Sequence, residues 1–91
     1  MSSPRLEIRY CTQCKFLLRA ALLAQELLMT FETELAEVAI VPSRGGVFEV
    51  ALDGHVLFSN KEAGRFPEAR ELKELVRDHI APGKAIGHDH P

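Results

Sequence analysis

The chain has 91 residues, of which 46% are hydrophobic and 26% charged, and its formal net charge is −2. This length fits one globular domain with a modest core, and the charge offers no basic excess for a nucleic-acid backbone. The apolar stretch Phe16–Met29 contains Arg19 and Glu26 and is too short to span a bilayer, and the first ten residues do not resemble a signal peptide. We therefore expect a cytoplasmic protein that binds neither nucleic acid nor membranes.

The N-terminal third predicts a strand followed by a long helix. Leu6, Ile8 and Tyr10 alternate with charged residues, which is typical of a strand buried on one face. The following pattern predicts a helix over about 14–31. Its core-facing residues are expected to be Phe16, Ala20, Leu23, Ala24, Leu27, Leu28 and Phe31.

The same helix has a second apolar sector, made of Leu18, Leu22 and Met29. A helix with two apolar sides contacts two neighbours. This sector either packs under the last helix of the domain or forms a surface for a partner or a second copy.

Two further strand patterns surround a tight turn. Residues 36–41 form an apolar run that ends at Pro42, and we expect this strand to run parallel to the first through a crossover. Residues 47–52 and 55–59 flank Asp53-Gly54, which predicts an antiparallel hairpin with a type I′ turn.

The C-terminal part predicts a polar loop over 59–66 and one more helix. Pro67 suits the first position of that helix, and Pro82-Gly83 ends it. Its apolar residues are Ala69, Leu72, Leu75, Val76 and Ile80. We expect residues 1–83 to form the single domain and residues 84–91 a flexible tail.

The element order is therefore β-α-β-β-β-α, an α/β fold (α+β in its mixed sheet) with four strands and two helices. Two helices on one face leave the opposite face of the sheet bare. The second strand has no clear polar alternation, so we expect a weak homodimer or a partner contact along it.

Both cysteines of the chain lie in the sequence Cys11-Thr12-Gln13-Cys14, between the first strand and the long helix. A Cys-x-x-Cys pair at this junction favours a thioredoxin-like fold with redox chemistry. A helix that begins here directs its N–H groups and positive dipole end toward sulfur, which favours the reactive thiolate. Two alternatives stay open: a pair of buried structural cysteines, and half of a metal site.

Residues beside the pair are candidates for tuning its pKa. Thr12 and Gln13 lie inside the motif, while Lys15 and Arg19 follow on the helix, where they either lower the thiol pKa or form a solvated stripe. His88-Asp89-His90 could form a weak metal-binding segment, but we expect it to be part of a flexible tail without a function.

The chain resembles the selenoprotein W-like (SelT/SelW/SelH, Rdx-type) family in its bacterial all-cysteine form, over residues 6–83. The segments that carry the resemblance are Arg9-Tyr10-Cys11-Thr12-Gln13-Cys14, Gly46-Val47-Phe48-Glu49-Val50, Asp53-Gly54 with Leu57-Phe58-Ser59, and Gly64-Arg65-Phe66-Pro67. The resemblance implies a thioredoxin-like fold and a redox role for Cys11 and Cys14. It also implies glutathione or thioredoxin as electron partner.

The attacking sulfur is open to two interpretations. In selenium-containing relatives the selenocysteine matches Cys14, whereas thioredoxin chemistry uses the first cysteine. We expect Cys11 to attack, because a sulfur at the mouth of a helix is more exposed than one inside the first turn.

We predict a small thiol–disulfide oxidoreductase without a bound cofactor, with glutathione as a co-substrate or a thioredoxin-type protein as reductant. Its acceptor would be a protein disulfide or a peroxide. The alternative is a redox-sensitive interaction module without turnover.

Overall fold

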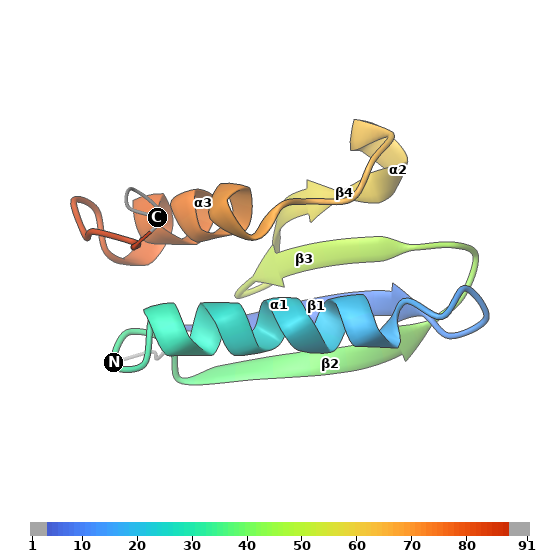
Figure 1. Cartoon of the computed structure of the whole chain (residues 1–91), viewed down its shortest axis with the longest axis horizontal. Helices are drawn as coiled ribbons and strands as arrows, with labels where there is room; N and C mark the ends of the chain where they lie inside the picture. The colour runs from blue at the N-terminus through green and yellow to red at the C-terminus, as the bar shows by residue number, and fades with distance from the viewer. Residues whose placement is uncertain (1–3, 88–91) are drawn as a thin grey trace.

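A computed structural model describes residues 4–87 of the chain. Its centre is a four-stranded mixed sheet in the order β2-β1-β3-β4 (Figure 1). The strands are β1 (Arg5–Cys11), β2 (Glu37–Ser43), β3 (Phe48–Leu52) and β4 (His55–Ser59). β1 pairs in parallel with β2 and antiparallel with β3, so the predicted α/β mixed sheet and the parallel first pair are confirmed.

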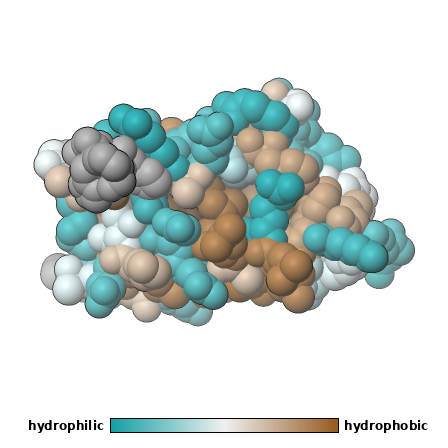
Figure 2. All heavy atoms as spheres, in the orientation of Figure 1, coloured by the Kyte–Doolittle hydropathy of each residue, from teal (hydrophilic) through white to brown (hydrophobic). Residues whose placement is uncertain are grey.

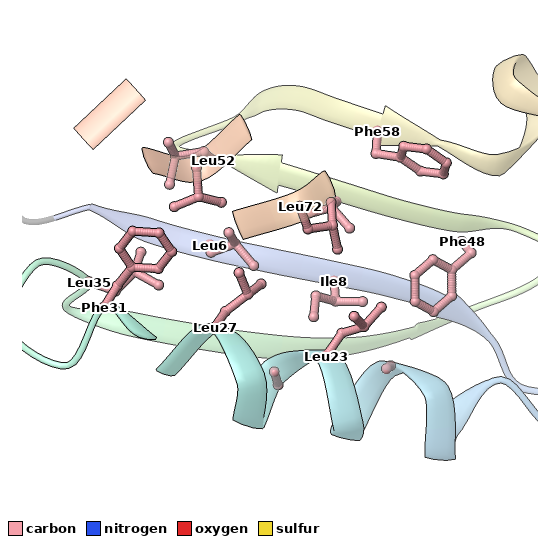
Figure 3. Packing of buried hydrophobic residues seen from close by; sticks show 14 of the residues in the cluster. Leu6, Ile8, Leu23, Leu27, Phe31, Leu35, Phe48, Leu52, Phe58 and Leu72 are labelled. Carbon is pink, nitrogen blue, oxygen red and sulfur yellow. The ribbon is translucent and has the colours of Figure 1, made fainter. Parts of the chain in front are cut away.

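Two long helices cover one face of this sheet (Figure 1). They are α1 (Leu17–Thr30) and α3 (Ala69–Ile80), and α2 (Asn60–Ala63) is a single turn. The buried apolar residues of α1 and α3 belong to one core cluster with alternate residues of the strands, as Figure 3 shows for Leu23, Leu27 and Leu72. Among residues 4–87, no helix is long and apolar enough to cross a membrane.

The core follows from the predicted alternation in β1. Leu6 and Ile8 are fully buried beneath α1 (Figure 3). A fully buried side chain of this size contributes roughly 1.5–3 kcal/mol relative to an exposed one. On the opposite face Glu7 forms ion pairs of 3.6 Å with both Arg5 and Arg9, so this side of β1 is polar as expected.

The hairpin between β3 and β4 has the predicted turn. Asp53 and Gly54 have φ values of 49° and 83°, and both central residues of a type I′ turn require positive φ. The backbone N–H of Arg5 donates to Asp53 Oδ1 at 2.9 Å, which fixes this turn to the start of β1.

Several boundaries differ from the prediction for local reasons. α1 begins at Leu17 instead of about residue 14, because residues 12–15 form a turn and Lys15 has φ 58°, outside the helical region. β2 continues through Pro42 to Ser43, because β2 lies at the sheet edge, where a proline without an N–H is tolerated.

The expected polar loop over 59–66 contains the α2 turn, which ends at Gly64 in the left-handed region. Pro67 lies before the N-cap of α3 instead of at its first position. Glu68 is the N-cap, and it forms a capping box with Glu71, which satisfies N–H groups at the helix start. The short intervening segment thus has more structure than its polar composition indicated.

Residues 84–87 are packed where the sequence predicted a flexible tail. Ile86 is 8% exposed within the core cluster, and Lys84 Nζ lies 3.1 Å from Glu34 Oε2. Ile86 is a single apolar residue outside any periodic pattern, so the sequence alone does not indicate that it is buried. The motif His88-Asp89-His90 lies outside the described residues.

Candidate redox site

The two cysteines lie at the end of the sheet where β1 passes into the turn before α1 (Figure 1). Cys11 is the last residue of β1, and its N–H donates to the Val47 carbonyl at 2.8 Å. The N–H and the hydroxyl of Thr12 both donate to the Ser43 carbonyl, at 3.1 and 3.3 Å. These bonds connect the motif to the chain segments that leave β2 and enter β3.

The sulfur atoms are free thiols placed for reaction with each other. The Cys14 thiol donates a hydrogen bond to the Cys11 sulfur, with the two Sγ atoms 2.7 Å apart. Cys11 is buried, with 1% of its surface exposed, whereas Cys14 is exposed. A disulfide between them needs only a short approach of the two sulfurs.

The shared hydrogen bond affects the two thiols in opposite directions. Donation from Cys14 lowers the pKa of Cys11, and burial partly opposes this by raising it. The backbone N–H groups of Gly46, Gln13 and Cys14 lower the pKa of Cys11 further. For Cys14 the same hydrogen bond raises the pKa, as do burial and the negative charge of a Cys11 thiolate. The dithiol form therefore holds its first thiolate at Cys11.

This geometry overturns the exposure argument that favoured Cys11 as the attacking sulfur. A more exposed Cys11 requires a helix that begins at the motif, with Cys11 at its first turn. α1 starts only at Leu17, so Cys11 is the buried last residue of β1 and Cys14 lies on the exposed turn that follows. Backbone N–H groups of the turn and of the β2–β3 loop take the role expected of the helix end.

Of the four residues expected to tune the pKa of the cysteines, two act on the cysteine turn and two do not. Thr12 anchors the turn, and the backbone of Gln13 lowers the pKa of Cys11. Lys15 and Arg19 are exposed and are not among the groups that shift either thiol pKa. The Arg19 guanidinium carbon instead lies 4.0 Å from the centre of the Phe66 ring.

Two residues that the sequence did not indicate act on the sulfurs. The Gly46 N–H lowers the pKa of both cysteines, and the positive charge of Lys61 on α2 lowers that of Cys14. The Lys61 ammonium also donates to the Gly45 carbonyl, which joins α2 to the loop beside the pair. In the sequence Gly46 stands out only as part of the segment Gly46-Val47-Phe48-Glu49-Val50, and Lys61 lies too far along the chain for a local motif to connect it with the cysteines.

An aromatic cluster supports the start of α1 beside the pair. Phe16, Phe48 and Phe66 meet edge to face, with ring centres 4.7 to 6.2 Å apart. An open hollow of about 420 Å³ lies beside Phe16 of this cluster. The residues that line it are Cys14, Lys15, Phe16, Leu18, Arg19 and Leu22.

The second apolar sector of α1 does not pack under α3. Leu18, Leu22 and Met29 are 83%, 60% and 71% exposed, and Leu28, expected in the core, is 40% exposed. Figure 2 shows hydrophobic residues gathered on the surface over α1. Among residues 4–87, no three His, Cys, Asp or Glu side chains gather where they could hold a metal ion.

Comparison with known proteins gives consistent matches over most of the chain. The model of the Rdx family matches residues 5–78. A crystal structure from Bordetella parapertussis is 54% identical, with a TM-score of 0.85 over 87% of this chain and 100% of that one. A selenoprotein W-related protein from Vibrio cholerae is 47% identical, with a TM-score of 0.84 over 87% of this chain and 99% of that one. No protein among those with curated descriptions matches.

Proposed function

Since this chain belongs to the Rdx family of selenoprotein W-related proteins, we propose that it is a small thiol–disulfide oxidoreductase acting through Cys11 and Cys14. The observation that carries the proposal is the pair of free thiols 2.7 Å apart, one buried and one exposed. Sulfur itself carries the two electrons, so the reaction needs no bound cofactor.

The exposed sulfur of Cys14 is the one that exchanges with a partner. Transfer of its proton to the Cys11 thiolate along their hydrogen bond leaves a thiolate at Cys14. This thiolate attacks a partner disulfide, forms a mixed disulfide and releases one partner thiolate. Cys11 then loses its proton to solvent and attacks the Cys14 sulfur, which closes the Cys11–Cys14 disulfide and releases the second partner thiolate.

The reverse reaction uses the same asymmetry. A reductant thiolate reaches only the Cys14 sulfur of the disulfide, because Cys11 is buried. Cys11 then leaves as a thiolate that backbone N–H groups stabilise, and a leaving thiol with a lowered pKa departs faster. Access and leaving-group stability therefore both favour Cys14 as the exchanging sulfur and Cys11 as the resolving one.

The electron partner in this proposal is glutathione or a thioredoxin-type reductant, and the acceptor is a protein disulfide or a peroxide. The setting is the reducing cytoplasm, where these reductants return the pair to the dithiol form. The cations around the pair favour anionic partners, and glutathione carries carboxylates.

A redox titration tests the proposal. The purified protein is equilibrated with glutathione buffers, alkylated and weighed by mass spectrometry. We expect a reversible two-electron transition between Cys11 and Cys14, roughly between −120 and −270 mV, as for known exchange proteins. Thiols that never pair, or that alkylate only after addition of a chelator, would contradict it.

The second candidate function is a redox-sensitive interaction module, which the exposed leucines beside Cys14 favour. A turnover assay distinguishes it from an oxidoreductase. An oxidoreductase reduces many equivalents of disulfide per molecule, whereas a sensor reacts once. Cys11→Ser and Cys14→Ser should each abolish turnover while the fold is retained, as checked by circular dichroism. Unchanged turnover in both variants would remove the pair from the mechanism.

A further inference from the structure

The positive charges of the molecule are distributed unevenly between ion pairs and the redox site. The chain has 11 lysine and arginine residues, and seven of them form ion pairs with carboxylates. The four without a carboxylate partner among residues 4–87 are Lys15, Arg19, Arg44 and Lys61.

All four belong to segments at the cysteine end of the sheet. Lys15 and Arg19 line the same hollow as Cys14, and Lys61 lowers the pKa of Cys14. Arg44 precedes Gly45-Gly46 in the loop whose N–H meets the sulfurs. A chain with a net charge of −2 thus has two unneutralised cations in the hollow beside Cys14 and a third, Lys61, close enough to act on its thiol.

The same hollow has an apolar side. Leu18 and Leu22 lie one helical turn apart, both largely exposed, and they extend from Cys14 along α1. Arg19 lies between them in sequence, and Phe66 holds its guanidinium by stacking, so its edge is available to a carboxylate. Exposed leucines next to a reactive sulfur mark a surface that a partner covers during exchange.

We propose that the hollow binds an extended, cysteine-bearing segment of a protein substrate, with aliphatic and acidic side chains near the cysteine that exchanges with Cys14. The inference rests on the proposed function and names its substrate class. Cys14 exchanges with the disulfide of the bound segment through the two steps given above, and both electrons pass from the cysteine pair to that disulfide.

The spacing of the leucines sets the spacing of the aliphatic residues. Leu18 and Leu22 are separated by roughly 6 Å along the helix, at 1.5 Å per residue. In an extended chain, alternate side chains share one side and are about 7 Å apart. Two aliphatic residues two positions apart therefore match the two leucines, and because the leucines follow Cys14 along α1, we place them two and four positions from the partner cysteine.

A second copy of this chain is a poorer occupant of the hollow. Two such surfaces would bring Lys15 and Arg19 of each copy against the same cations of the other, which is repulsive. A stable contact there would also cover Cys14 and stop exchange. An acidic segment instead neutralises the cations and leaves with its reduced cysteine.

The test measures exchange rates with four synthetic substrates, each with one cysteine in a mixed disulfide with thionitrobenzoate. Three are peptides of equal length: one with leucines at positions two and four and neighbouring glutamates, one with the leucines replaced by serine, and one with the glutamates replaced by lysine. The fourth is the mixed disulfide of N-acetylcysteine amide. Released thionitrobenzoate is followed by absorbance.

We expect the leucine–glutamate peptide to react about five- to tenfold faster than each altered peptide. The advantage over the lysine peptide should shrink as salt is raised, because the cations are exposed. The double variant Leu18→Gln/Leu22→Gln should lower the rate ratio of the leucine–glutamate peptide to the small disulfide by a similar factor. The matched control Met29→Gln changes an exposed apolar residue of α1 outside the hollow and should leave that ratio unchanged.

The outcomes separate the two proposals. Equal rates for all three peptides, with the small disulfide also reacting, would overturn the docking surface and leave the oxidoreductase intact. Failure of every substrate, the small disulfide included, would overturn the proposed function and with it the inference. If the protein formed a concentration-dependent dimer in which Cys14 is protected from alkylation, the occupant of the hollow would be a second copy of the chain. This result would also overturn the inference.

Discussion

At the residue scale, burial and hydrogen bonding divide two chemically identical thiols into different species. Cys11 ends a strand and accepts hydrogen bonds, so its pKa is lowered. Cys14 lies on an exposed turn and donates to Cys11, so its pKa is raised. The sulfur that holds the first thiolate is thus not the sulfur that a partner can reach, and the hydrogen bond between them connects the two roles.

The direction of these shifts predicts how single substitutions change the titration. Cys14→Ala removes the donor that lowers the pKa of Cys11, so the pKa of Cys11 should rise. Cys14→Ser retains an O–H donor and should raise it less. Conversely, Cys11→Ala should lower the pKa of Cys14, because the bond and the charge that raise it are both lost.

Thiolate absorbance in the ultraviolet, recorded against pH for each variant, measures these values. In the wild type we expect the lower of the two transitions to belong to Cys11. If Cys11 titrated at the same pH in Cys14→Ala and in the wild type, the shared hydrogen bond would not control its pKa.

At the element scale, an ion pair connects the two long helices. Lys73 Nζ of α3 lies 2.8 Å from Glu26 Oε1 of α1, and the lysine side chain is 8% exposed. The Glu26 side chain is 39% exposed, so the pair lies where the helices meet at the surface. This contact turns Lys73 inward on a helix whose other buried residues, Leu72 and Val76, are apolar.

Removing the Glu26 carboxylate should lower the free energy of unfolding more than removing the charge of Lys73. Glu26→Ala leaves the buried Lys73 ammonium without this carboxylate and should lower the free energy of unfolding by about 1–3 kcal/mol. Lys73→Met keeps the volume and removes the buried charge, so it should change that free energy by less than about 1 kcal/mol.

Urea unfolding at neutral pH measures both variants, with Gln25→Ala on the exposed side of α1 as the control. If Glu26→Ala and Lys73→Met lowered the free energy of unfolding equally, the loss in Glu26→Ala would not come from leaving the buried ammonium of Lys73 without its carboxylate.

At the scale of the whole molecule, one core holds the helices, the sheet and the C-terminal segment together. Ile86 joins the same cluster as Leu6 and Leu72, although it follows the last helix by several residues. The Lys84–Glu34 ion pair lies two residues earlier, where the segment approaches the loop after α1. The domain therefore includes residues beyond the Pro82-Gly83 stop.

Ile86→Ala should lower the free energy of unfolding by about 2 kcal/mol, because it empties a buried aliphatic site near the edge of the core. Ala85→Ser, at an exposed neighbouring position, serves as the control and should have little effect. Chemical unfolding of the full chain measures both. An unchanged midpoint in Ile86→Ala would mean that residues 84–87 do not contribute to the core.

The sequence alone determined those features that neighbouring residues control. Alternation in residues 6–10 predicted the buried face of β1, Asp53-Gly54 predicted the hairpin turn, and the apolar spacing of 69–80 predicted α3. Each is a local preference of the backbone or a fixed period of side chains, so it can be read without knowledge of the fold. The Cys-x-x-Cys spacing likewise placed the reactive pair.

Only the tertiary structure decided which sulfur is exposed, what surrounds it and which leucines stay uncovered. Gly46 and Lys61 reach the sulfurs because β3 and α2 return to the end of β1, a contact between segments more than 30 residues apart. Leu18 and Leu22 are exposed because α3 packs beside the other side of α1. A periodic pattern shows that one side of a helix is apolar. Whether another element packs against that side depends on where segments distant in the sequence lie.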